Sequence, residues 1–245
     1  MYASTTESPV LLVGTAHVVD LSVPLRHLFE ARPFDAVALE LDADRAAVLH
    51  EGSTAPGGGS GLPVFVRLWG VLQRRLGTTI GGGVPGAEMK VAAELAGERK
   101  IPVFLIDDPL RETVLKLVRT LPLKERVTLL VAAILGLFVP PNVVEDEMNR
   151  YSERPQEYSE ELRRVSPTVA RVLLDERNER MADRLRALRQ RGFGRVVAIV
   201  GDAHLTGLTD ALHRRGVAVE ALPLRTLRGA TAPLSSPFRG PRPRL

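Results

Sequence analysis

Two similar stretches of this chain each place a histidine shortly after an apolar run. VLLVGTAHV spans residues 10 to 18, and VAIVGDAHL spans residues 197 to 205. The shared pattern gives two matching pairs, Gly14 with His17 and Gly201 with His204. Glycine lets the backbone turn tightly and approach a ligand closely. We therefore predict that both stretches, with Thr15 and Asp202 at their variable position, contribute to one substrate-binding site.

Two carboxylates follow other apolar runs in the same way. Glu40 ends the run DAVALE, and Asp107 follows the run IPVFLI. Near-continuous apolar runs of this kind favour parallel strands that are covered on both faces. Ligands of such sheets bind outside the carboxyl ends of the strands. We expect His17, His204 and the two carboxylates to meet at that edge.

The residue types at this edge allow two kinds of chemistry. Two imidazoles and a carboxylate, here His17, His204 and Glu40, can ligate a divalent metal and leave positions open for water. Such a metal lowers the pKa of its bound water and polarises a carbonyl group. The same pair of histidines could instead act as acid and base without a metal. The residues alone leave both mechanisms open.

A helix predicted within residues 171 to 190 carries a further candidate pair. Its apolar stripe runs through Leu174 and Met181, and both Arg177 and Asn178 fall on that buried face at spacings of three and four. A buried arginine needs an anionic partner. The candidate partners are Glu40, Glu88, Asp107 or a substrate carboxylate. The alternative is an arginine that extends out of the core to solvent.

Glu88 has two interpretations of equal weight. It lies in the first turn of a helix predicted over residues 86 to 97, where a carboxylate favours the helix dipole. The glycines before it would also allow close approach to a ligand, which makes Glu88 a candidate site residue.

The order of elements predicts an α/β fold with a mostly parallel central sheet and flanking helices. The expected strands are residues 10–14, 35–40, 101–106, 195–200 and 217–222. Residues 108 to 192 read as a long helical insertion, or cap, between the third and fourth of these strands. The apolar run 127 to 141 is too short to span a membrane and is expected to be a buried helix, with an interfacial helix as the weaker alternative. We expect one domain over residues 1 to 227, and a disordered Pro/Arg-rich tail over 228 to 245.

Composition limits the classes of function. The 245 residues include no cysteine, so disulfides, thiolate ligands and cysteine nucleophiles are excluded. The net charge of +4 is matched by four arginines in the tail, which leaves the rest of the chain neutral. We therefore expect no nucleic-acid partner. With no signal peptide and no transmembrane segment in view, we expect a soluble, cytoplasmic protein.

Six motifs, in order, give the chain a family resemblance. GTAHV, VALELD with Arg45, GAEM, LIDD, LLDERNERMA and GDAHL together resemble the TraB/PrgY family, over roughly residues 9 to 222. That family is related to the Tiki proteins and, more distantly, to ChaN and the erythromycin-esterase-like group. The resemblance implies an α/β sheet with a helical insertion, and two Gly-x-x-His motifs with a glutamate as its hallmarks. These hallmarks correspond here to Gly14 with His17, Gly201 with His204, and Glu40.

The resemblance also implies an activity. Tiki proteins are metal-dependent proteases, and PrgY limits the activity of peptide pheromones. By similarity, this chain is expected to be a metal-dependent peptidase or amide hydrolase that uses manganese, cobalt or zinc and acts on a peptide or small amide. Glu88 or Asp107 would be the general base, and Arg177 would hold a substrate carboxylate or the developing oxyanion.

Other functions stay open beside this one. The same cleft could bind or sequester a peptide without turnover, in the manner of a pheromone inhibitor, with Arg177 and the histidines as carboxylate contacts. Haem binding, as in ChaN-like relatives, is a weaker alternative. The chain could also form a homodimer. Many TraB-like proteins carry a transmembrane region after this domain, and no such region follows here, which argues against a membrane-bound role.

Overall fold

A five-stranded, all-parallel sheet forms the centre of the computed structural model, which describes residues 8–15, 21–51, 86–136 and 155–229. The strands are β1 (Val10–Thr15), β2 (Ala36–Leu39), β3 (Val103–Leu105), β4 (Val196–Gly201) and β5 (Val219–Leu222). Their order across the sheet is β3-β2-β4-β1-β5. The α/β class and all five strands predicted from the sequence are confirmed.

Helices connect these strands. Before β3 the chain forms α1 (Ser22–Ala31), α2 (Ala43–Glu51) and α4 (Ala87–Glu98). Between β3 and β4 lie α5 (Leu110–Thr120), α6 (Leu123–Gly136), α8 (Pro155–Val165), α9 (Pro167–Ala170), the π-helix η1 (Arg171–Asp175) and α10 (Glu176–Gln190). After β4 come the 3-10 helix η2 (Asp202–His204), α11 (Leu205–Arg214) and, beyond β5, α12 (Leu224–Gly229). The described part of the insertion is thus helical, as predicted.

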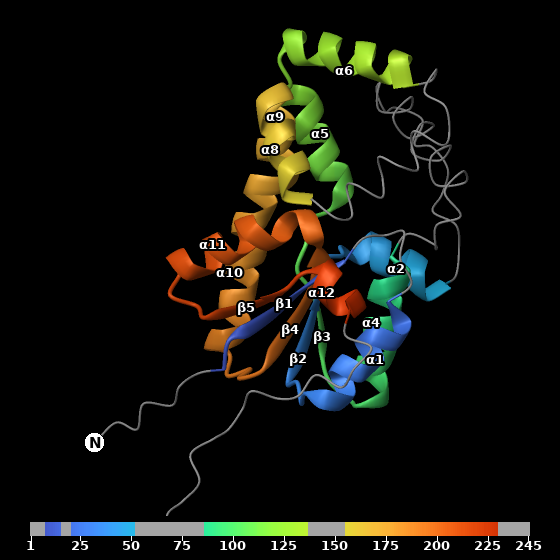
Figure 1. Ribbon diagram of the computed structural model, residues 1–245, viewed down its shortest axis with the longest axis vertical. Helices are drawn as coiled ribbons and strands as arrows, with labels where there is room; N and C mark the ends of the chain where they lie inside the picture. Colours follow the sequence, from blue (N-terminus) through green and yellow to red (C-terminus); the bar gives the residue numbers. More distant parts are fainter. Residues whose placement is uncertain (1–7, 16–20, 52–85, 137–154, 230–245) are drawn as a thin grey trace, which may run out of the picture.

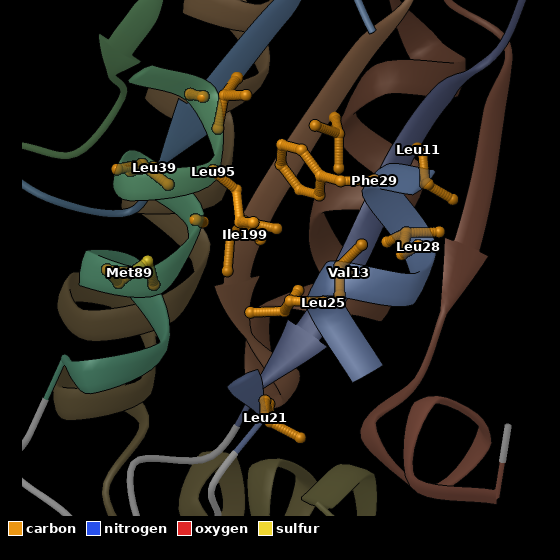
Figure 2. Packing of buried hydrophobic residues seen from close by; sticks show 14 of the residues in the cluster. Leu11, Val13, Leu21, Leu25, Leu28, Phe29, Leu39, Met89, Leu95 and Ile199 are labelled. Atoms are coloured by element: carbon orange, nitrogen blue, oxygen red, sulfur yellow. The ribbon is translucent and has the colours of Figure 1, made fainter. Parts of the chain in front are cut away.

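Alternation along the strands builds a core on each face of the sheet. Odd-numbered residues of β1 and β2, such as Leu11, Val13 and Leu39, pack with α1 and α4. Figure 2 shows this cluster, with α1 supplying Leu25 and Phe29 to it. Even-numbered residues of the same strands point to the opposite face and pack against α10 and α11. The helices therefore divide into two layers, one on each side of the sheet (Figure 1).

This division creates a topological switch point at β4. The connections that follow β1 and β2 lead to helices on one face, whereas β4, which lies between them, leads into α11 on the other face. Adjacent strands whose connections diverge in this way leave a crevice at their carboxyl ends, where ligands of α/β proteins bind. The register aligns these ends, since Leu39 pairs with Ile199 and Thr15 with Gly201.

Two expectations about burial are wrong. The edge strand β3 was expected to be covered on both faces, but Val103 and Leu105 are each 38% exposed, because the core that α1 and α4 form on that face includes no residue of β3. The apolar run from 127 was expected to be a buried helix. In α6, however, Val127, Leu130 and Val131 are exposed. No helix within the described ranges has the length and apolar character to cross a membrane.

Four helices of the insertion, α5, α6, α8 and α9, stand at the carboxyl edge of the sheet, whereas α10 packs on one of its faces. Figure 1 shows α5, α8 and α9 gathered at that end, with α6 beyond them. Buried Glu125 fixes the start of α6 to α9, because it accepts hydrogen bonds from Ser166 Oγ and from the Thr168 amide and hydroxyl. Helix α8 packs against η2, which carries His204. Residues 52 to 85, residues 137 to 154 and most of the expected tail lie outside the described residues.

The two-layer core makes a stability prediction. We expect Leu25→Ala, at a fully buried position, to lower the free energy of unfolding by about 2–5 kcal/mol, because it leaves a cavity in the α1 layer. Leu123→Ala is the matched control, since Leu123 is 75% exposed, and it should change that free energy by no more than about 0.5 kcal/mol. Denaturant unfolding measures both, and equal losses would contradict the assigned core.

Candidate active site

A cluster of charged side chains at the carboxyl edge centres on Arg177 of α10. Its Nε donates to Asp107 Oδ1 at 2.9 Å, and one terminal nitrogen donates to Asp107 Oδ2 at 2.6 Å and Glu40 Oε1 at 2.5 Å. The other terminal nitrogen lies 3.0 Å from the Leu173 carbonyl and 3.1 Å from His204 Nε2. A guanidinium has five N–H groups, and these five contacts use all of them.

Glu40 joins three elements at this point. It directly follows β2, and its Oε2 accepts a hydrogen bond of 2.6 Å from the Gly201 amide at the end of β4. Its Oε1 meets Arg177 and also lies 3.2 Å from His204 Nε2. The paired register of β2 and β4 brings the carboxylate and the amide together. Glu40 is therefore held with one oxygen toward the sheet and the other toward the cluster.

The contacts of His204 define its neutral tautomer. Arginine can only donate, so Nε2 must accept when it pairs with Arg177. The proton of the neutral ring is then on Nδ1, which lies 2.7 Å from Asn178 Oδ1 and donates to it. This assignment also requires that the amide oxygen of Asn178, not its nitrogen, faces the ring. A second proton on Nε2 would instead point toward Glu40.

Asp107 links this cluster to a second arginine. Its Oδ2 accepts from Arg45 at 2.5 Å as well as from Arg177. Arg45 in turn bonds to Asp42, whose carboxylate also accepts from the amides of Arg45 and Leu110 at the start of α5. Two guanidiniums thus face three carboxylates, those of Glu40, Asp107 and Asp42, so this group carries one surplus negative charge. The side chains of Glu40, Asp107, Arg177 and His204 are at most 15% exposed.

The electrostatics keep both carboxylates ionised. Burial raises the pKa of Glu40, but protonated His204, Arg177 and the Gly201 amide lower it by more, so it falls well below its usual range. Burial likewise raises the pKa of Asp107, and its contacts with Arg177 and Arg45 bring it below the ordinary value. The same carboxylates raise the pKa of Arg177 against the effect of its burial. Asp202 differs, because burial raises its carboxyl pKa.

Two glycines allow the close approaches that the site requires. A Cβ on Gly14 would lie within bonding range of Asp202 Oδ1, which accepts a 3.0 Å hydrogen bond from the Leu224 amide. A Cβ on Gly207 in α11 would lie 2.3 Å from the Asn178 amide nitrogen. Because they lack a Cβ, Gly14 leaves room for the Asp202 side chain and Gly207 leaves room for the Asn178 side chain near the ends of the strands.

The structure brings together most of the residues that the sequence singled out. Glu40, Asp107, Arg177, Asn178, Gly201 and His204 form one network of contacts. Thr15 is buried beside it, with its hydroxyl donating to the Val200 carbonyl. Glu88 is buried in the first turn of α4, and none of the contacts above involves it. His17 lies outside the described residues.

Sequence reasoning missed three features of the site. Arg45 and Asp42 were not assigned to it, although their places after a strand-ending glutamate could have indicated them. The π-helix η1 was not predicted either. It ends just before Arg177 and supplies the Leu173 carbonyl that receives one of the arginine's N–H groups. Such π-turns occur frequently at functional sites.

The fit of a divalent metal depends on Arg177. The separation of 3.2 Å between Glu40 Oε1 and His204 Nε2 suits two ligands of one ion, and a ring whose Nδ1–H is held by an oxygen is typical of a metal-binding histidine. Arg177, however, already contacts both atoms. Within the described ranges no group of three or more histidine, aspartate or glutamate side chains is arranged to hold a metal. With Arg177 in place, these residues do not fit an ion.

A shallow hollow at the opposite, amino-terminal edge of the sheet is a poorer candidate. It is lined by Asp35, Arg189 and Arg195 among others. Arg195 pairs with Asp35 at 2.5 Å, and Arg189 donates to the carbonyls of Phe193 and Gly194. These contacts tie the turn before β4 to β2, which is a structural role.

The fold defines the class: this is an α/β protein with a parallel sheet, a helical insertion and a Glu–His–Arg cluster at the switch point of the sheet. Comparison with known sequences identifies the family. The chain belongs to the TraB/PrgY/gumN family, whose model matches residues 3–221. It is also 28% identical over 232 residues to an uncharacterized protein of Methanocaldococcus jannaschii. That match covers 87% of this chain and 56% of the relative, so the chain spans about half the relative's length.

The lowered carboxylate pKa values predict how stability depends on pH. A carboxylate whose pKa is lower in the folded than in the unfolded chain stabilises the fold. That stabilisation is complete at pH values above the pKa of the unfolded chain, which is about 4.5 for glutamate. It is lost as the pH falls from there through the pKa of the folded chain. We expect the free energy of unfolding to decrease below about pH 4.5, and Glu40→Gln to make that decrease smaller. Denaturant unfolding between pH 7 and 3 measures it. Glu98→Gln, in an exposed pair, should follow the wild-type curve, and a Glu40→Gln curve parallel to wild type would contradict the assignment.

The close approach of Gly207 to Asn178 makes a second prediction. We expect Gly207→Ala to lower the free energy of unfolding by about 1–3 kcal/mol, because the new methyl group would overlap the Asn178 amide. Gly97→Ala in α4 is the control. Nothing lies within 4 Å of the added Cβ there, so alanine should stabilise that helix by about 0.5–1 kcal/mol. If denaturant unfolding shows both variants to be stabilised, the Asn178 contact is wrong.

Proposed function

We propose that this chain hydrolyses an amide bond of a peptide or small amide at the cluster of Glu40, Arg177, Asn178 and His204. The observation that carries the proposal is the arrangement of His204. Its Nδ1 lies 2.7 Å from Asn178 Oδ1, and its Nε2 lies 3.2 Å from the ionised Glu40 and 3.1 Å from Arg177. A histidine oriented on one side and next to a carboxylate on the other is equipped to act as a general base.

The reaction follows from these contacts. As the Arg177 N–H leaves the lone pair of His204 Nε2, that nitrogen takes a proton from a water molecule, whose oxygen attacks the scissile carbonyl carbon. The imidazolium that forms is stabilised by Glu40, whose lowered pKa keeps it anionic. The same proton later passes from Nε2 to the leaving nitrogen as the carbon–nitrogen bond breaks. Glu40, with its pKa so far below neutrality, is a stabilising anion in this scheme and not the base.

Arg177 contributes at the moment of proton transfer. In the resting arrangement all five of its N–H groups are used, which leaves none for a substrate. Once Nε2 is protonated it can no longer accept, and the N–H that pointed to it becomes available. That group can then donate to the oxyanion that develops on the attacked carbonyl. This role agrees with the oxyanion contact that the sequence suggested for Arg177.

The divalent metal that the family resemblance implies has no part in this reaction. Glu40 and His204 are the described candidates to hold manganese, cobalt or zinc, with His17 as a third from outside the described residues. A bound ion would supply a water of lowered pKa and polarise the carbonyl. The steps above use only side chains that the structure describes, because Arg177 contacts both ligand atoms.

A peptide-binding module without turnover is the second candidate. The observation that favours it is the closed network, in which the ion pairs among Glu40, Asp107, Arg177 and Arg45 hold these side chains in place. Such a network can serve as a rigid surface on which a peptide binds. In that case Thr15, Asp202 and Asn178 would lie beside the bound peptide, and no bond of the peptide would be broken.

His204→Ala tests the proposed hydrolase. We expect this variant to lower kcat/KM at least a hundredfold on any peptide or amide that the wild type cleaves, since general-base catalysis is worth about 10²–10⁴. His213→Ala is the control, because His213 is exposed at the end of α11. A panel of fluorogenic peptides and amides measures cleavage, and fluorescence anisotropy measures binding. Binding without cleavage by the wild type would assign the cluster to the peptide-binding module.

A further inference from the structure

Arg177 and a divalent metal would need the same two atoms. Glu40 Oε1 lies 2.5 Å from one terminal nitrogen of Arg177, and His204 Nε2 lies 3.1 Å from the other. These are the two described atoms whose separation suits a metal. An ion at the usual bond length of about 2.1 Å from Glu40 Oε1 would stand less than about 5 Å from the guanidinium, and the two like charges would repel.

The remaining contacts of Arg177 keep it in this position. Asp107 holds it with two hydrogen bonds, and the Leu173 carbonyl of η1 accepts a third. None of these three bonds involves a candidate metal ligand, so an ion that took Glu40 and His204 would not release the guanidinium. The side chain is also 15% exposed, which leaves it little solvent to move into.

The charge of the cluster leads to the same conclusion. Glu40, Asp107 and Asp42 face Arg177 and Arg45, so the group has one surplus negative charge before any ion enters. A divalent ion would turn this into a surplus positive charge in a largely buried setting, beside two guanidiniums, which is unfavourable without further anions.

We propose that the guanidinium of Arg177 takes the place of a metal ion at this site. It holds Glu40 Oε1 and His204 Nε2 as a permanent cation, and the native protein binds divalent metal at these residues only when that guanidinium is removed. This inference concerns the resident cation of the cluster, and it holds whether or not the cluster turns over a substrate.

Manganese binding to the full-length protein tests the proposal, with Mn²⁺ alone as the probe. Electron paramagnetic resonance of free Mn²⁺ and titration calorimetry measure the affinity. We expect Arg177→Met, which keeps the side chain's length without its charge, to bind Mn²⁺ at least tenfold more tightly than the wild type. Adding His204→Ala to that variant should abolish the gain.

Arg180→Met is the matched control. Arg180 lies one turn further along α10, and its guanidinium pairs with Asp108 and Glu176 instead of the cluster. It should bind Mn²⁺ no more tightly than the wild type. The proposal is overturned if the wild type binds Mn²⁺ as tightly as Arg177→Met, or if Arg180→Met produces the same gain.

A measurement on the wild type alone covers the case in which Arg177→Met does not fold. Nitrogen-15 NMR of the histidine rings should show His204 with its proton on Nδ1 and an unprotonated Nε2. Submillimolar Mn²⁺ should leave the His204 resonances no broader than those of exposed His213. Selective broadening of His204 at such concentrations would overturn the proposal without any appeal to activity.

Discussion

The buried guanidinium of Arg177 imposes the constraint on which the site depends. A charge taken out of water is costly unless every one of its donors finds a partner. Arg177 meets that condition through four residues that lie far apart in the sequence: Glu40, Asp107, Leu173 and His204. Each of these partners must reach the same point, so the arginine fixes the relative placement of the ends of β2, β3 and β4 and the start of α10.

The fold meets this constraint through its topology. Strand β4 lies between β1 and β2 in the sheet, although in the sequence it comes after β3 and the long helical insertion. That insertion lets α10 return along the face opposite to α1 and α4, which directs Arg177 at the switch point from the second layer. The π-helix η1 adds the last element, because its Leu173 carbonyl receives an N–H that would otherwise lack a partner.

The sequence predicted the parts that depend on local patterns. Apolar runs identified the five strands, and helical spacing placed Arg177 and Asn178 on the buried face of α10. The same reasoning named Glu40 and Asp107 among the anionic partners of Arg177, but it could not choose between them or exclude Glu88, since that choice depends on strand order. It also failed for α6 and β3. An apolar run shows that a segment can be buried, whereas its actual exposure depends on which neighbours the topology supplies.

Proton uptake at His204 Nε2 would link the structural role of Arg177 to the proposed chemistry. So long as the guanidinium donates to Nε2, the ring carries its proton on Nδ1, and Asn178 must present its oxygen. Protonation of Nε2 breaks the contact with Arg177 and makes one with Glu40, which lies at hydrogen-bond distance already. The cluster therefore has two arrangements that differ by one proton, and the second has a free arginine N–H beside an imidazolium. A site that gains an anion-binding donor as its base takes up a proton is suited to reactions in which both events occur together, as they do when water adds to a carbonyl group.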